Sequence, residues 1–246
     1  LNTATVQFSN GSIANCNGGA GVYTFARQQL LVLAKSCDFY GNTLFARQAQ
    51  SRSVALNSGG GGLYSLSESA SVALTIEHCT IANNSVVLGG YSTATSSQGG
   101  GSLYLNGNKS VVLHIGNSML TSSVVSGAVT SPLKLFNGGS VLYAFSNGQV
   151  NLTFNNVLVA DSVALLSESL SSSSSLAVLG GAVYAVSAQD QVEVTSVSLV
   201  MANNSVICYS CVSTEASAKM FLGGALIVLS PAGSSQVTLN QSVSTG

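Results

Sequence analysis

Charged residues are scarce in this chain of 246 residues. Lys and Arg number 7 and Asp and Glu number 8, so charged side chains make up 6% of the sequence, against roughly a quarter in an ordinary globular domain. Proteins that bind nucleic acid neutralise phosphates with clustered Lys and Arg. We therefore expect no nucleic-acid partner, no polybasic membrane-binding surface and no charge-rich disordered tail.

Long apolar runs are also missing, although 46% of the residues are hydrophobic and the mean hydropathy is +0.44. The longest near-apolar stretch, 176–186, contains a Gly pair and spans 11 residues, whereas a membrane-spanning helix needs roughly 20. We expect no membrane insertion.

A Gly-rich segment followed by an apolar residue and Tyr recurs along the chain. The recurring position is occupied by Tyr23, Tyr64, Tyr104, Tyr143, Tyr184 and, in a sixth copy, Ile227. The steps between these positions are 41, 40, 39, 41 and 43 residues. Self-similarity at a fixed period of this length indicates a repeat architecture.

Each repeat has the same internal pattern. After Tyr come a few alternating residues, a polar turn, a segment of strict apolar–polar alternation such as 111–115, and a third segment that ends in a small polar turn. The third segments are 39–42, 81–84, 158–161 and 201–204. This pattern predicts three short strands per repeat, and a variable stretch rich in Ser and Gly then leads to the next Gly pair.

Three short strands per repeat are typical of a parallel β-helix, in which each repeat is one coil and strands of successive coils pair about 4.8 Å apart. We predict an all-β solenoid of about six coils of roughly 41 residues in a single domain, 1–246. Inward ladders are expected at the Tyr positions, at the alternating apolar positions, and at Phe39, Ile81 and Leu158. Gly pairs suit a bend because Gly accepts positive φ and has no side chain to clash with its stacked equivalent, and Asn at the third turn can adopt left-handed geometry and bond along the stack.

Two other repeat architectures have periods near 40. Helical solenoids need apolar residues at i, i+3 and i+4 and strong helix formers, whereas this chain is rich in Ser, Val, Gly and Asn and has only two Pro. A β-propeller is the closer competitor, but it needs four strands per blade and closure of the ring.

Two short motifs resemble those of a known family. GGA followed by an aliphatic residue occurs at 180–183 and 223–226, and F-x-x-N occurs at 39–42, with relaxed versions at 81–84 and 201–204. The repeats resemble those of the chlamydial polymorphic outer-membrane proteins and, more broadly, right-handed β-helices of the pectin-lyase-like superfamily. The resemblance implies right-handed winding and an extracellular or cell-surface location, and it carries over no catalytic residue.

The five cysteines suggest two disulfide candidates. Cys37 and Cys79 stand at the same place in successive repeats, so they are expected within disulfide reach, although inward free thiols remain an alternative. Cys208 and Cys211 form a lone CxxC, which favours a local disulfide or two free thiols over zinc, because zinc takes four ligands. Cys16 has no partner in the repeat.

Six N-x-S/T sequons are candidate glycosylation sites, a number close to chance for this composition. They are Asn10, Asn83, Asn108, Asn151, Asn203 and Asn240.

Candidate catalytic clusters are missing. The acids include no D-D, D-x-D or E-x-D pair, as carbohydrate-active enzymes and calcium sites would require. Asp190 and Glu193 lie across a turn, and Asp38 and Glu77 fall near one turn in adjacent coils. We interpret all four as solvated residues and expect no metal and no cofactor.

The basic and imidazole side chains are interpreted in the same way. His78 is expected in a surface turn, and His114 is expected to point outward from a strand. Arg27, Arg47 and Arg52 gather in the first repeat, where they could clamp an acidic sugar or could simply be solvated.

The ends of the chain are expected to be open. Phe8 matches Phe39, so the chain begins in a third strand and ends after a second strand. The domain is then a fragment of a longer solenoid or a unit that stacks on copies of itself.

The functional hypothesis is a structural, non-enzymatic β-helix of an extracellular fibre, appendage or wall, with itself or neighbouring parts of a longer chain as its partner. The alternative is an adhesin or carbohydrate-binding module that binds glycans through the variable loops. Those loops are 85–98, 122–136, 163–178 and 205–221.

Overall fold

The computed structural model describes residues 3–9, 13–49, 54–90, 97–129, 135–167, 176–209, 219–223 and 225–245. Every regular element in these residues is a β-strand, and the strands pair in parallel. No described residue belongs to a helix that could cross a membrane.

The strands form four sheets, which we call A, B, C and D in the order in which the chain enters them. Sheet A consists of β1 (Thr3–Ser9), β6 (Thr43–Ala49), β11 (Ser85–Gly90), β15 (Val124–Val129), β19 (Val163–Ser167) and β23 (Ser205–Tyr209). Sheet B consists of β2 (Ile13–Gly19), β7 (Val54–Gly60), β12 (Ser97–Gly100), β16 (Leu135–Gly139), β20 (Leu176–Gly180) and β24 (Lys219–Gly223). Sheet C consists of β3 (Val22–Ala26), β8 (Leu63–Ser67), β13 (Leu103–Gly107), β17 (Leu142–Ser146), β21 (Val183–Ser187) and β25 (Leu226–Leu229).

Sheet D has nine strands, because one long strand in some repeats is divided into two in others. Its members are β4 (Leu30–Lys35), β5 (Asp38–Tyr40), β9 (Ser71–Glu77), β10 (Thr80–Ala82), β14 (Ser110–Thr121), β18 (Gln149–Ala160), β22 (Val192–Ala202), β26 (Ser235–Asn240) and β27 (Val243–Thr245). Thus β14 pairs along its length with both β9 and β10 of the preceding repeat.

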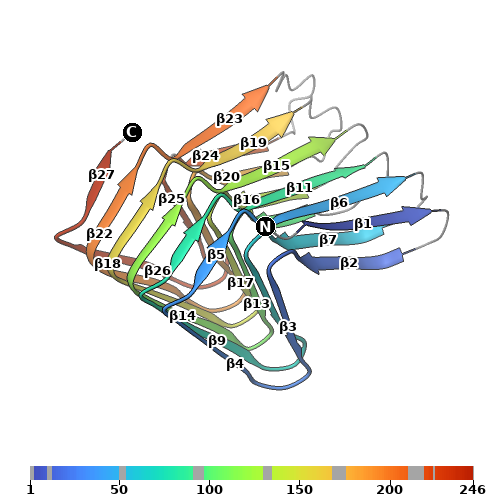
Figure 1. The fold of residues 1–246 in the computed structure, drawn as a ribbon. Helices are drawn as coiled ribbons and strands as arrows, with labels where there is room; N and C mark the ends of the chain where they lie inside the picture. The colour runs from blue at the N-terminus through green and yellow to red at the C-terminus, as the bar shows by residue number, and fades with distance from the viewer. Residues whose placement is uncertain are drawn as a thin grey trace.

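Successive repeats lie on one another in register. Within each six-stranded sheet the strands follow chain order, and in Figure 1 sheet A passes from blue β1 through green β15 to orange β23. Tyr64 pairs with Tyr23 and Tyr104 in sheet C, and the series continues to Ile227. We call one repeat a rung, and equivalent residues in successive rungs a column. The prediction of an all-β, parallel stacked fold is confirmed, and the arrangement is consistent with a β-helix.

The structure differs from the prediction in its number of strands. The three strands predicted per repeat correspond to sheet C and to the two parts of sheet D. The stretch from the end of sheet D in one repeat to sheet C in the next was expected to be a loop, but it supplies the strands of sheets A and B. For example, β11 and β15 lie inside the predicted loops 85–98 and 122–136. These strands contain Ser and Gly and do not show a regular apolar–polar alternation. Backbone hydrogen bonds to the parallel strands of the neighbouring rungs hold them in place.

Two predicted alignments are wrong. Leu158 is not the equivalent of Ile81, because Ile81 pairs with Leu120 and Leu120 pairs with Val159. Leu158 is therefore shifted by one residue to the other face of the strand, and Val159 takes the buried position. Phe8 pairs with Gln48 rather than matching Phe39, so the first strand belongs to sheet A.

The main hydrophobic core lies between sheets C and D. Alternate residues of β14 face it, and Val111, Leu113 and Ile115 are fully buried. Leu103 and Leu105 of β13 join the same core from sheet C.

The tyrosines form a second cluster, outside this core. Tyr64, Tyr104, Tyr143 and Tyr184 are buried together on the opposite face of sheet C. The rings from Tyr23 to Tyr143 stack with centroids 5.0, 4.7 and 5.1 Å apart. The Tyr184 ring lies 5.4 Å from that of Tyr143 and is tilted by 39° to it. The prediction of a Tyr ladder is right, but its placement in a single shared interior is wrong, because Leu103 and its equivalents take the inward position and strand alternation turns Tyr to the other face.

The Gly pairs serve close packing and not left-handed geometry. A Cβ at Gly100 would collide with the carbonyl oxygen of Leu103 and lie 2.8 Å from the backbone nitrogen of Tyr143 in the next rung. Among the described glycines only Gly41 has positive φ. The expectation that these glycines are stacked without side-chain clash agrees with the structure, and the expectation of positive φ is wrong.

Candidate functional site

Two columns of left-handed residues flank the second part of sheet D, the part that contains β5, β10 and β27. The first contains Ser36, His78, Asn117, Asn156, Ser198 and Gln241, and the second contains Gly41, Asn83, Ser122, Asp161 and Asn203. Their φ values lie between 46° and 66°, a range that Asn, Asp and Gly adopt more readily than other residues. His78 is therefore an exposed turn residue, as expected.

A buried polar column follows the second left-handed column. Asn84 Oδ1 accepts hydrogen bonds from the backbone nitrogen and from Nδ2 of Asn42, at 3.0 and 2.9 Å. Asn84 Nδ2 donates to the carbonyl oxygen of Phe39 at 2.8 Å. In later rungs Ser162 Oγ accepts from the backbone nitrogen of Ser123 at 3.1 Å. The expected bonding of turn Asn residues along the stack is thus present, both at the left-handed position, where Asn203 Nδ2 donates to Asp161 Oδ1, and at the residue after it.

The two cysteines predicted to stack do so beside the first left-handed column. The backbone nitrogen of Cys37 donates to Cys79 Sγ at 3.4 Å. Cys79 is buried, Cys37 is half-buried, and both are free thiols in this structure. Burial raises the pKa of the Cys79 thiol. A disulfide between them stays a prediction.

One ion pair lies on the outer face of sheet D near these thiols. Lys35 Nζ is 3.1 Å from Glu77 Oε2, and the hydrogen bond and charge of Lys35 lower the pKa of Glu77. His114 and His78 add smaller effects in the same direction. Sequence reasoning missed this pair, although Lys35 and Glu77 are separated along the chain by the same interval as the two cysteines.

The other ionisable candidates do not form a catalytic arrangement among the described residues. Asp38, Asp190 and Arg27 are exposed, and Glu193 is half-exposed on its strand. The side chain of Arg47 and the whole of Arg52 lie outside the described residues. Within the described part of the chain no group of three or more His, Cys, Asp and Glu side chains could hold a metal ion.

The remaining predicted cysteines are described only in part. Cys208 lies in β23 and Cys16 in β2, but their side chains, and all of Cys211, are outside the described residues. The CxxC disulfide candidate therefore stays a prediction.

Five of the six sequons fall on described residues. Asn83 is exposed in a left-handed turn, and Asn240 is exposed in the last rung. Asn108 Oδ1 accepts a hydrogen bond from Asn147, and Asn203 Nδ2 donates to Asp161. The fifth, Asn151, lies within β18 and its Oδ1 is buried without a hydrogen bond. Asn10 lies outside the described residues.

Both end rungs present residues of core type to solvent. In β3, Val22, Tyr23 and Phe25 are 37%, 47% and 45% exposed. In β26, Val237 and Leu239 are 44% and 57% exposed, although their partners Val194 and Ser196 in the preceding rung are buried.

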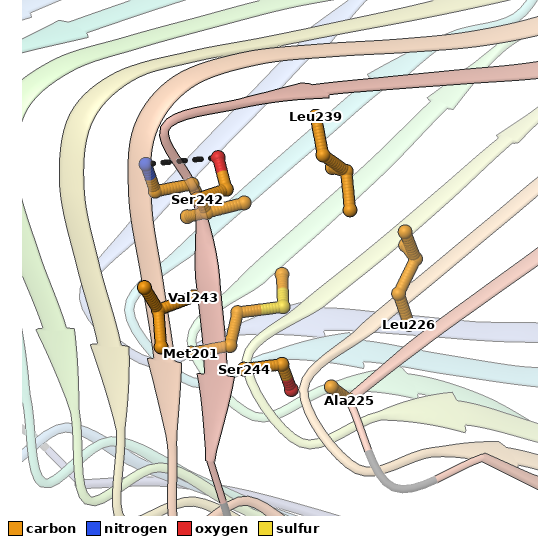
Figure 2. A pocket seen from close by; sticks show the side chains of 8 residues that line it. Met201, Ala225, Leu226, Leu239, Ser242, Val243 and Ser244 are labelled. Atoms are coloured by element: carbon orange, nitrogen blue, oxygen red, sulfur yellow. Dashed lines mark hydrogen bonds between the residues drawn. The ribbon is translucent and has the colours of Figure 1, made fainter.

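The last rung leaves a hollow of about 180 Å³ at its end of the core. Figure 2 shows Met201, Leu226 and Leu239 around this hollow, with Val243 on the short final strand. Ser242 Oγ accepts a hydrogen bond from the backbone nitrogen of Leu199 at 3.3 Å, which ties the last turn to the rung before it. The hollow is almost wholly apolar and is closed on one side by the stack.

Comparisons of the chain with protein-family models, with curated proteins and with solved structures return no match.

Proposed function

We propose that this chain is a structural module that builds an extended β-solenoid through contacts at its two end rungs. The observation that supports this proposal is the exposure of core-type side chains at both ends, where Val22 and Leu239 are half-exposed. Exposed apolar surface and unpaired strand edges favour association with a further rung of the same kind. A second copy of the chain, or further rungs of a longer chain, would supply it.

The finer architecture belongs to the same proposal. We infer a right-handed helix of about six coils, each as long as one sequence repeat, related to the pectin-lyase-like superfamily and located outside the cell or at its surface. The six-stranded sheets A, B and C support the number of coils. The low charge supports stacking, because equivalent residues lie about 4.8 Å apart and like charges there would repel.

The Tyr column supports continuation across an end-to-end junction. Tyr23 stands half-exposed at one end, and Ile227 occupies the same column at the other end. Stacking a second copy would place Tyr23 on Ile227 and Val32 near Val237, so that apolar side chains cover one another. The alternative, glycan binding through 85–98, 122–136, 163–178 and 205–221, is an untested hypothesis, and the central parts of these ranges lie outside the described residues.

Assembly state tests the proposal. Leu239→Lys places a charge in the end-rung surface, where covering it would be costly, while Val112→Lys places the same charge on the outer face of β14 in the middle of the stack. We expect sedimentation velocity to show concentration-dependent assembly of the wild-type chain and of Val112→Lys, and monomers of Leu239→Lys. A wild-type chain that stays monomeric at all concentrations, without filaments in negative-stain micrographs, would contradict self-stacking and leave only neighbouring parts of a longer chain as the covering rungs.

A further inference from the structure

Cys37 and Cys79 occupy one column in successive rungs. They directly precede β5 and β10, in which Asp38 pairs with Thr80, and Cys37 donates its backbone N–H to Cys79 Sγ at 3.4 Å. Neighbouring strands lie about 4.8 Å apart, inside the range of about 4.4–6.8 Å that disulfide-bonded Cα atoms show.

The two thiols also point in the same direction. Cys37 Sγ lies 3.0 Å from the carbonyl oxygen of Lys35, and Cys79 Sγ lies 3.2 Å from that of Glu77, two residues earlier in each case. The side chains are therefore held side by side in like conformations, both against the main core.

We propose that Cys37 and Cys79 form a reversible disulfide across two rungs, which links sheet D covalently under oxidising conditions. This inference does not depend on the proposed stacking function. The bond would close a loop that is one sequence repeat long, and it would restrict the unfolded chain accordingly.

The exposure of the two thiols sets the order of the chemistry. Half-buried Cys37 reacts first: its thiolate attacks a small-molecule disulfide such as oxidised glutathione, and the displaced thiolate takes up the proton that Cys37 lost. Buried Cys79 then loses its proton and attacks Cys37 Sγ in the mixed disulfide, releasing the second small thiol. Two protein thiols are oxidised and one small disulfide is reduced to two thiols, so atoms and electrons balance.

A peptide map of the 246-residue chain tests the proposal. The variant Cys16→Ser/Cys208→Ser/Cys211→Ser retains only the two thiols in question and is incubated with oxidised glutathione, alkylated and digested. We expect a linked peptide pair that contains Cys37 and Cys79, protected from alkylation and released by dithiothreitol. Two alkylated thiols, or glutathione attached to Cys37 without the linked pair, would overturn the proposal. The same map of the wild-type chain decides the matter if the variant does not fold.

The next rung offers matched controls, because Ser118 continues the column and accepts a hydrogen bond from the backbone nitrogen of Cys79 at 3.0 Å. In the same background, Cys37→Ser/Ser118→Cys places thiols one rung apart, and Cys79→Ser/Ser118→Cys places them two rungs apart, about 9.6 Å. We expect the first variant to form the linked pair and the second to remain alkylatable, since about 7 Å is the limit for bridging. Equal linking in both would show that stacking does not control the reaction, and would overturn the inference.

Discussion

At the residue scale, the turns of this molecule depend on buried amides and hydroxyls and not on charge. Asn84 is fully buried, and its carboxamide satisfies two groups of the preceding rung, the backbone N–H of Asn42 and the carbonyl oxygen of Phe39. A buried polar group of this kind stabilises only while all its partners are present, because each orphaned group costs its desolvation. The neighbouring residue Asn83 is exposed and contributes its left-handed geometry.

Replacing Asn84 should therefore be far more damaging than replacing Asn83. Asn84→Ala leaves the Asn42 N–H and the Phe39 carbonyl without their partner, and we expect a loss of about 2–4 kcal/mol in the free energy of unfolding. Asn83→Gly keeps left-handed geometry accessible and should change this free energy by less than about 1 kcal/mol. Denaturant titrations of both variants measure the difference, and equal effects would contradict the role of the buried column.

The Lys35–Glu77 ion pair predicts a small acid dependence of stability. The pKa of Glu77 is lowered from 4.5 in the folded state, so its contribution is present above the unfolded pKa and is lost as the pH falls through the lower, folded pKa. We expect the melting temperature of the wild-type chain to fall slightly more than that of Glu77→Gln below about pH 4.5. The effect is small because both side chains are partly exposed to solvent; identical melting curves down the acid range would show that the pair contributes nothing.

At the scale of elements, sheets form here in two ways. Strands of sheet D carry alternating aliphatic residues, as in 111–115, and their existence could be predicted because a half-buried strand needs that pattern. β12 is only Ser97–Gly100, with the sequence SQGG, and holds its place through the same pairing in the strands before and after it. Side-chain patterns could not reveal such a strand, whereas the Gly pair repeated at a fixed interval marked its position.

The candidate sites show the same limit. The stacking of Cys37 on Cys79 could be predicted because the repeat length alone sets it, and the same spacing would have revealed the Lys35–Glu77 pair. The position of Leu158 could not be predicted from the sequence. Leu158 and Val159 are both aliphatic, and a shift of one residue exchanges the two faces of a strand. The separate Tyr cluster could not be predicted without sheet B, which lies against it. Gln98 of sheet B accepts a hydrogen bond from the Tyr104 hydroxyl at 2.9 Å.

Two glycines in sheets B and D provide a matched test of close packing. Gly100→Ala drives a methyl group into the carbonyl of Leu103 and the backbone of Tyr143, and we expect a loss of about 3 kcal/mol or more, or failure to fold. Gly116→Ala meets only His114 Nε2 at 3.5 Å and Glu77 Cγ at 3.7 Å, which are ordinary contacts. This second variant should unfold within about 1 kcal/mol of wild type or be more stable; comparable losses in both variants would contradict the packing argument.

At the scale of the whole molecule, each rung contacts mainly the rung on either side. Stability in such an array is a sum over rungs and their interfaces, so central rungs with two neighbours are more stable than end rungs with one. The strands β26 and β27 are exposed along their whole length, whereas β14 and β18 are buried at alternate positions.

Amide hydrogen exchange should therefore be graded along the stack. We expect slow exchange in β14 and β18, close to the limit set by global unfolding, and exchange many-fold faster in β25, β26 and β3. Mass spectrometry of peptides at a concentration where the chain is monomeric measures the gradient. Uniform protection from one end to the other would show that the molecule opens as a single unit.

The spacing between the two left-handed columns is the same in each of the rungs where both are present: Ser36 to Gly41, His78 to Asn83, Asn117 to Ser122, Asn156 to Asp161 and Ser198 to Asn203. From the second column to the next Tyr or Ile, by contrast, the spacing varies, and it is longer from Asn203 to Ile227 than from Asn83 to Tyr104. Most of the variation in chain length thus falls in the crossing from sheet A to sheet B. A foreign peptide inserted between a strand of sheet A and the next strand of sheet B would be attached to strand ends that recur from rung to rung. Groups grafted onto several rungs would therefore have attachment points separated by whole multiples of a strand separation.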